Sequence, residues 1–236
     1  MFTVALIGPD GSGKTTVGRR LERSLTLPIK YIYMGINRDA SNFMLPTTRL
    51  VRMSYRALGM KQKTGPTDPN HISSPPEGRV RRAGFLLKSN LGRTNLICEG
   101  LFRQGMAWYY RLRGYIVLFD RHFFFDFYTS DIANGEKRRP FLNRLHSLVL
   151  ERFHPKPDLV IYLDAPAELL FARKGEGTLE ALEHWRHKYR QMGSQFRHFV
   201  VVDSNQTEDN VVRDVAAHVW DFYKAWGKTK GRNVKE

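Results

Sequence analysis

The stretch Gly8-Pro9-Asp10-Gly11-Ser12-Gly13-Lys14-Thr15 decides how the rest of the chain is interpreted. It fits the pattern G-x-x-x-x-G-K-[ST], in which a glycine-rich loop wraps around a row of phosphates. The apolar run at residues 2–7 precedes it and favours a buried strand, and Val17, Leu21 and Leu25 follow it at helical spacing. A strand, a glycine loop and a helix in this order are the context that the pattern requires. The sequence therefore predicts a nucleotide site.

The residue types in this loop suit a polyphosphate. Its glycines let the backbone turn sharply, so that successive N–H groups point at phosphate oxygens. The helix that follows adds the positive end of its dipole. We expect Lys14 to span the β- and γ-phosphates and the Thr15 hydroxyl to bind Mg²⁺. The candidate residues for binding the nucleotide are Gly8, Asp10, Gly11, Ser12, Gly13, Lys14, Thr15 and Thr16.

Length and composition limit the class of protein. The 236 residues suit one α/β domain, and the 42% of hydrophobic residues are ample for a core. Cys98 is the single cysteine, which excludes a disulfide framework and agrees with a reducing cytoplasm. The apolar run at the start is too short for a secretory signal, and no stretch approaches the length of a membrane span. We expect a soluble cytoplasmic protein.

The charge of the chain favours anionic partners. Its 38 Lys and Arg against 23 Asp and Glu leave a formal net charge of +15. Nucleotides, phosphorylated sugars, nucleic acid and an acidic membrane surface all fit this surplus, and so does a solvated basic surface. Composition alone leaves these alternatives open.

The remaining pattern alternates strands with helices, which predicts a parallel sheet covered on both faces. Leu96-Ile97-Cys98 lies in a stretch that favours helices but is also compatible with a strand. The expected strands are residues 2–7, 29–34, 115–119, 159–163 and 199–202. The expected helices are 16–25, helices within 78–113, and 141–153, 166–174, 179–196 and 207–226.

Three segments of the single domain 1–236 differ from this pattern. Residues 36–82 form a basic, proline-broken insert with nine Lys and Arg against three acids, and 63–70 and 73–76 have the chemistry of turns or loops. Gly175 and Gly177 interrupt two expected helices, which suggests a flexible break within 173–180. The basic tail, 227–236, is expected to be frayed.

Charged residues follow several of the predicted strands. Asp120-Arg121, Asp164 and Asp203 each come at the end of an apolar run. Ligands bind beyond the carboxyl ends of parallel strands, so these residues and the glycine loop should gather on one rim of the sheet. A surface ion pair is the structural alternative for Asp120-Arg121, and a favourable helix C-terminus is the alternative for Arg173 and Lys174.

In three segments the sequence resembles the thymidylate kinase family of P-loop nucleoside monophosphate kinases. The first is the glycine loop, with an aspartate in its middle and Thr16 after it. The second is Asp120-Arg121-His122 at the end of an apolar strand. The third runs from Pro157-Asp158-Leu159 to Asp164-Ala165-Pro166-Ala167-Glu168, followed by Arg173. In order and spacing the likeness covers most of the chain.

This resemblance implies a P-loop NTPase fold with a five-stranded parallel sheet, a closing lid at 173–180, ATP as donor and Mg²⁺. Asp10 matches the loop carboxylate that in the family meets the acceptor sugar or a catalytic arginine. Asp120 matches the aspartate near metal and acceptor, and Arg121 the arginine that binds the acceptor phosphate. Arg173 lies where some members supply an arginine to the transferred phosphoryl group. The expected catalytic residues are Lys14, Asp120, Arg121 and Arg173, and the expected metal ligands are Thr15 and Asp120.

The acceptor side departs from the family. Its members usually carry an Arg-Glu-Pro-Gly-Gly segment after the second strand, whereas residues 33–38 here are Tyr-Met-Gly-Ile-Asn-Arg. The expected activity is ATP-dependent phosphorylation of a nucleoside monophosphate, with dTMP as the default acceptor. The alternatives are a kinase of the same fold for a phosphorylated sugar, a lipid-linked intermediate or a polyphosphate, and a non-enzymatic basic nucleotide-binding module.

Further interactions remain open at this stage. A small-molecule phosphate acceptor is the expected partner, and an anionic surface, either membrane or nucleic acid, and a homodimer are further candidates. The aromatic residues Phe123, Phe124, Phe125, Phe127 and Tyr128 favour core packing, and stacking on an acceptor base is their alternative role.

Overall fold

The computed structural model describes residues 1–35, 41–57, 79–122, 155–175 and 177–229. Five strands carry the architecture: β1 (Thr3–Ile7), β2 (Ile29–Tyr33), β3 (Ile116–Asp120), β4 (Leu159–Asp164) and β5 (Phe199–Asp203). The helices among these residues are α1 (Lys14–Ser24), α2 (Pro46–Ala57), α3 (Arg79–Leu112), α6 (Ala167–Lys174), α7 (Leu179–Met192) and α8 (Glu208–Thr229), with a short 3₁₀ turn at Gly193–Gln195.

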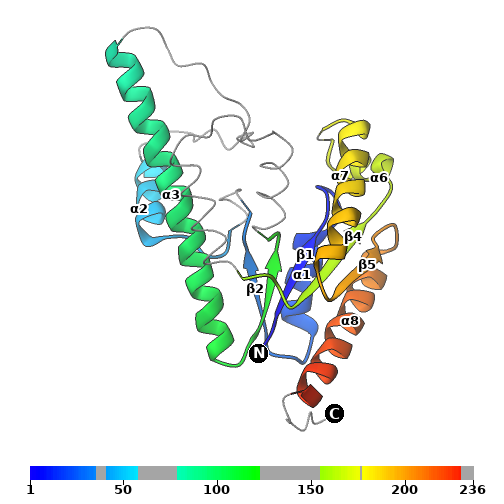
Figure 1. Cartoon of the computed structure of the whole chain (residues 1–236). Coiled ribbons are helices and arrows are strands. Elements are labelled where there is room, and N and C mark those ends of the chain that lie inside the picture. Colours follow the sequence, from blue (N-terminus) through cyan, green and yellow to red (C-terminus); the bar gives the residue numbers. More distant parts are fainter. Residues whose placement is uncertain (36–40, 58–78, 123–154, 176, 230–236) are drawn as a thin grey trace.

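The five strands form one parallel sheet in the order β2-β3-β1-β4-β5 (Figure 1). Leu6 of β1 pairs with Asp120 of β3, and Asp164 of β4 pairs with Asp203 of β5. The carboxyl ends of all five strands therefore lie along one rim. The prediction of an α/β protein with a five-stranded parallel sheet is confirmed.

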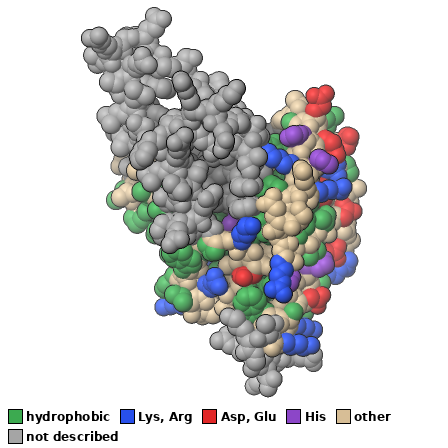
Figure 2. Space-filling view, in the orientation of Figure 1, with side chains coloured by type: hydrophobic (Ala, Val, Ile, Leu, Met, Phe, Trp, Pro, Cys, Tyr) green, Lys and Arg blue, Asp and Glu red, His purple; other side chains and the backbone are tan. Residues whose placement is uncertain are grey.

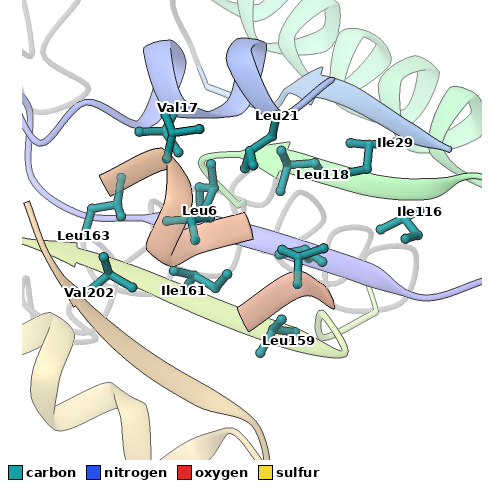
Figure 3. Close-up of a cluster of buried hydrophobic side chains, with 14 of the residues drawn as sticks. Leu6, Val17, Leu21, Ile29, Ile116, Leu118, Leu159, Ile161, Leu163 and Val202 are labelled. Carbon is teal, nitrogen blue, oxygen red and sulfur yellow. The ribbon is translucent and has the colours of Figure 1, made fainter. Parts of the chain in front are cut away.

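One face of the sheet packs against α1 and α8. Leu6, Leu118 and Ile161 point to this side from three neighbouring strands, and Figure 3 shows them beneath Val17 and Leu21 of α1. Val215 and Val219 of α8 belong to the same cluster and are fully buried. Because strand side chains alternate, the residues between them must point to the opposite face.

The opposite face packs against α3 and α7. Ala5, Phe119 and Tyr162 belong to this second cluster, together with Ala107 of α3 and Tyr189 of α7. The central strands are thus buried on both faces, which explains why they are nearly continuous apolar runs. The expected helices on both faces of the sheet are confirmed.

The insert at 36–82 contains an element that the sequence pattern did not predict. Residues 46–57 form α2, which begins at Pro46, a residue that suits the first helical position because it needs no N–H partner there. Thr48 donates a hydrogen bond to Asn95 of α3 at 3.1 Å, and the N–H of Leu45 lies 3.2 Å from the Glu99 carboxylate. These contacts attach α2 to α3, so the insert contains a helix that the sequence analysis did not assign.

Helix α3 excludes the strand considered at Leu96-Ile97-Cys98. Asn95, Glu99 and Arg103 recur every fourth residue on one side of α3, where they bind the segment at 43–48. A strand would break this spacing. Residues 227–229 belong to the last turn of α8, and whether the tail 227–236 frays is not tested.

Several predictions fall outside the described residues. These are the aromatic residues 123–128, the helix at 141–153, the loops at 63–70 and 73–76, and the tail from 230. Within the described parts of the chain, no helix combines the length and the apolar character that crossing a membrane requires.

Candidate functional site

The glycine loop is packed so tightly that two of its glycines cannot be replaced without strain. Gly8 has φ 147°, and a Cβ there would lie 2.5 Å from the Leu163 carbonyl oxygen. Gly11 has φ 88°, and its Cβ would lie 2.8 Å from the Leu170 carbonyl oxygen. The loop is therefore pressed between the end of β4 and helix α6. Its backbone conformation is determined by these neighbours.

Lys14 lies inside the curve of this loop. Its Nζ donates to the carbonyl oxygens of Gly8 and Pro9 at 2.7 Å each and to Ser12 Oγ at 3.3 Å. The side chain is buried at the start of α1, where N–H groups of the first turn lack acceptors within the helix. A buried ammonium beside a helix N-terminus creates a strongly positive position.

Asp120 forms a polar cluster at the end of β3. Thr15 Oγ1 donates to Asp120 Oδ2 at 2.5 Å, and the Tyr31 hydroxyl donates to the same oxygen at 2.6 Å. The other oxygen, Oδ1, is buried and has no hydrogen-bond partner in the described structure. Burial, together with the Asp120 charge, raises the pKa of Tyr31, so its hydroxyl remains a donor near neutral pH.

The oxygen atoms of this cluster suit Mg²⁺. The ion prefers hard oxygen ligands and is commonly held by one or two carboxylates together with substrate phosphates. Asp120 Oδ1 lacks a donor among the described residues, and Thr15 Oγ1 can bind a cation through a lone pair while it donates its proton to Asp120. The described residues contain no group of three or more His, Cys, Asp or Glu that could hold a metal alone.

Arg121 has an unusual backbone conformation. Its φ of 64° lies in the left-handed region, which costs a non-glycine residue about 1–2 kcal/mol. Its guanidinium forms an ion pair with Asp10 Oδ1, and Lys174 Nζ lies 3.4 Å from Asp10 Oδ2. Burial raises the pKa of Asp10, but Arg121, Lys14 and Lys174 outweigh it and leave the pKa below its ordinary value. Strained residues of this kind cluster at functional sites.

The segment after β2 approaches Arg121 closely. A Cβ on Gly35 would lie 2.6 Å from Arg121 Cδ, so only glycine fits there without a shift. The Gly35 carbonyl accepts a hydrogen bond from Arg103 Nη1 at 2.8 Å, and Arg103 Nε donates to the Phe43 carbonyl at 3.2 Å. Arg103 is buried in α3 and fixes this side of the site.

A cavity of about 300 Å³ opens on the other side of the glycine loop. Arg173 lies in its wall at the last turn of α6, where Nη2 donates to the Ser204 carbonyl at 3.1 Å and Nη1 lies 3.4 Å from the Gly11 carbonyl oxygen. The rest of the wall includes Gly13, Thr16, Val17, Gln206 and Val211. The cavity thus combines apolar and polar side chains from α1, α8 and the loop after β5.

The connection after Arg173 corresponds to part of the predicted lid. Helix α6 ends at Lys174, and Gly175 caps it in the left-handed conformation with φ 68°. Thr178 then caps α7 by accepting a hydrogen bond from the N–H of Ala181 at 3.2 Å. The lid prediction for 173–180 is not tested by this geometry.

The two other rim aspartates have different surroundings. Asp164 accepts hydrogen bonds from Arg186 at 2.8 and 3.1 Å, from Arg190 at 2.5 Å and from the Tyr162 hydroxyl at 2.8 Å. Burial raises the pKa of Asp164, but these donors more than compensate and lower it overall. Asp203 is exposed and accepts from the N–H of Asn205 at 2.8 Å. Neither residue lies in the Thr15–Asp120 cluster.

The structure brings the predicted residues together in three groups. Thr15 meets Asp120, Arg121 meets Asp10, and Arg173 meets Gly11. Sequence reasoning missed Tyr31, which looked like an apolar strand residue, and Gln206 in the cavity wall. For Lys174 the sequence analysis gave only the alternative of a favourable helix C-terminus, although its position beside Arg173 was a usable signal.

No protein-family model matches this chain, and no curated protein matches it. What the site can do must therefore follow from its own residues. These residues supply the buried ammonium of Lys14 within the glycine loop and the hydroxyl–carboxylate pair of Thr15 and Asp120. They also supply Arg121, whose backbone is strained, and a cavity beside the loop. A charged phosphate ligand is one that such a set of groups could hold.

Proposed function

We propose that this protein is an ATP- and Mg²⁺-dependent phosphotransferase with the P-loop NTPase fold. It transfers the γ-phosphoryl group of ATP to a nucleoside monophosphate, with dTMP as the first acceptor to test. One observation carries the proposal: Lys14, the Thr15–Asp120 pair and Arg121 all lie at the carboxyl-end rim of the sheet. Phosphoryl transfer depends mainly on alignment and charge neutralisation, and this set of residues is equipped for both.

The donor occupies the glycine loop and the adjacent cavity. Lys14 and the N–H groups at the start of α1 bind its phosphates. Val17 and Val211 offer apolar surface to the base, and the Gln206 amide offers it hydrogen bonds. Thr15 and Asp120 are the residues that would hold Mg²⁺, which would supply positive charge to the donor phosphates.

The acceptor lies on the Arg121 side of the loop. A guanidinium grips two phosphate oxygens through its planar fork, and the strained backbone aims it. Asp10 orients Arg121 through their ion pair. Arg173 contributes a second guanidinium toward the transferred group from the cavity side, and the 173–180 segment excludes water from the reaction.

A panel of acceptors tests this proposal directly. Release of ADP from ATP and Mg²⁺ is measured with dTMP, dUMP, other nucleoside monophosphates, a phosphorylated sugar, a lipid-linked phosphate and polyphosphate. We expect a nucleoside monophosphate to give the highest turnover. Lys14→Ala should lower kcat by a factor of at least 10³, whereas the exposed Lys224→Ala is a matched control that retains it. Normal turnover by Lys14→Ala would contradict the donor assignment.

A non-nucleotide anionic acceptor is the second candidate, favoured by the charge of the acceptor side. Helices α2 and α3 together contain ten Lys and Arg and one acid, Glu99. By contrast, basic and acidic side chains are interspersed over α7 and α8 at the right-hand edge of Figure 2. Turnover with the sugar, lipid-linked or polyphosphate acceptor, and none with nucleotides, would replace the first proposal by this one.

The third candidate is a non-enzymatic basic nucleotide-binding module. It predicts retention on nucleic acid or anionic vesicles, with an affinity that falls steeply as the salt concentration rises. It also predicts no ADP release with any acceptor. The same panel, followed by a salt series, therefore separates the three candidates.

A further inference from the structure

Two hydroxyl groups converge on one oxygen of Asp120. Thr15 Oγ1 lies 2.5 Å from Oδ2 and the Tyr31 hydroxyl lies 2.6 Å from it. The carboxylate is fully buried, and no ion pair to it occurs within the described residues. A buried carboxylate needs compensating interactions, and here two neutral donors provide them on one side.

This asymmetry leaves the other oxygen available. Asp120 Oδ1 is buried without a hydrogen-bond partner in the part of the chain that the structure describes. An unsatisfied buried acceptor costs about 1–3 kcal/mol. Because both donors contact Oδ2, they restrain the rotation of the carboxylate about its Cβ–Cγ bond and leave Oδ1 without a donor among the described residues.

The Tyr31 ring is held in place by its packing. A Cβ on Gly18 of α1 would lie 2.7 Å from the ring, so the helix passes directly against its face or edge. The Arg19 guanidinium lies 6.0 Å from the ring centre. The ring is buried, and its strand β2 pairs directly with β3, which carries Asp120. A rigid ring with a single polar tip can orient a partner with little loss of entropy.

We propose that Tyr31 is a positioning residue for the divalent cation of this site. Its hydroxyl holds Asp120 Oδ2, so that Oδ1 and Thr15 Oγ1 both present lone pairs to the metal. The inference rests on the proposed function, because it assigns the cation that accompanies ATP to this cluster. Outer contacts of this type typically change metal affinity by 10- to 100-fold when they are removed.

Tyr31→Phe removes one oxygen atom and tests the proposal. Tyr162→Phe is the matched control, because Tyr162 is also a buried strand tyrosine that donates to an aspartate, Asp164. The affinity of each protein for a fluorescent ATP analogue is measured as free Mg²⁺ is raised, and again in EDTA. We expect the Mg²⁺ concentration at half-saturation to rise about tenfold in Tyr31→Phe and less than twofold in Tyr162→Phe. The affinity of either variant for the analogue in EDTA should equal that of the wild type.

The outcomes separate the inference from the proposed function. Unchanged half-saturation in Tyr31→Phe, with a lower melting temperature, would make Tyr31 merely structural and overturn the inference alone. A wild-type protein that binds the analogue equally with and without Mg²⁺, or not at all, would overturn the proposed function as well. Gly18→Ala is the second variant, because it moves the Tyr31 ring and keeps the hydroxyl. We expect the same rise in the Mg²⁺ concentration at half-saturation, and its absence counts against the proposal.

Discussion

Two buried aspartates flank the central strand β1, one at the end of β3 and one at the end of β4. Each accepts a hydrogen bond from a buried tyrosine, Asp120 from Tyr31 at 2.6 Å and Asp164 from Tyr162 at 2.8 Å. The difference lies in the remaining partners. Two arginines of α7 contact Asp164, whereas Asp120 has a second hydroxyl donor and, in the described part of the chain, one oxygen without a donor.

This difference separates a structural carboxylate from one that can bind a ligand. The guanidinium of Arg186 grips both oxygens of Asp164, and Arg190 adds a third contact. Its charge is therefore already neutralised, and its contacts connect α7 to the sheet. Within the described residues Asp120 has two hydroxyl donors and no ion pair, and it lies beside Thr15 and the glycine loop, where a divalent cation would find the partner it needs.

The largest expected effects come from exchanging each aspartate for asparagine. Asp120→Asn should lower kcat by a factor of about 10³ with little change in melting temperature, because it removes a charge that serves the cation. Asp164→Asn should lower the free energy of unfolding by about 2 kcal/mol and leave turnover per folded molecule within a few fold, because it breaks a buried ion pair. Steady-state kinetics and urea unfolding of both variants check this. A reversed pattern would contradict the comparison.

Arg121→Lys tests the acceptor side next. Lysine keeps the charge but lacks the planar fork, so acceptor-dependent turnover should drop about a hundredfold while ATP affinity changes little. Arg113→Lys, at an exposed position beside the Tyr109 ring, is the control and should change neither quantity. If Arg121 served only as a structural ion pair, its variant would melt at a lower temperature and keep its kcat.

The two arginines around Asp164 should contribute unequally to stability. Arg186 is bidentate and its side chain is 16% exposed, whereas that of Arg190 is 57% exposed. Arg186→Ala should therefore cost about 2 kcal/mol of unfolding free energy and Arg190→Ala about 0.5 kcal/mol or less. Chemical unfolding of the two variants measures the difference, and equal losses would refute this division of roles.

The smallest effect is a dependence of stability on pH. The pKa of Asp164 lies below its ordinary value of 3.8 in the folded protein, so ionised Asp164 stabilises the fold above that pH. This contribution is lost as the pH falls through the lowered pKa. The difference in unfolding free energy between wild type and Asp164→Asn should be constant from about pH 5 to 7 and shrink below about pH 4. A difference that grows on acidification would be incompatible with this sign.

Local sequence patterns predicted the sheet and the loop well, for a physical reason. Strands buried on both faces, such as Ile116–Asp120, are continuous apolar runs, and the glycine loop needs its residue types at fixed spacing. The roles of Asp120 and Asp164 were not predictable in this way. Both follow apolar strands, and only the fold brings Arg186 and Arg190 to one and Thr15 to the other.

Two other features also depend on tertiary contacts. Helix α2 is stabilised by Asn95 and Glu99 of α3, which are remote in sequence, so its own pattern gave no sufficient signal. Tyr31 has the same surroundings in the sequence as any buried strand residue. Its hydroxyl gains a role only because β2 lies next to β3 in the sheet.

The most direct measurement compares the affinity for ATP with saturating Mg²⁺ and with EDTA, by calorimetry, in wild type, Asp120→Asn and Asp164→Asn. We expect Mg²⁺ to increase the affinity of wild type and of Asp164→Asn at least tenfold, and to leave that of Asp120→Asn unchanged within about twofold. The affinities in EDTA should be similar in all three proteins. An undiminished Mg²⁺ effect in Asp120→Asn, or its loss in Asp164→Asn, would contradict the assignment of the cation to Asp120.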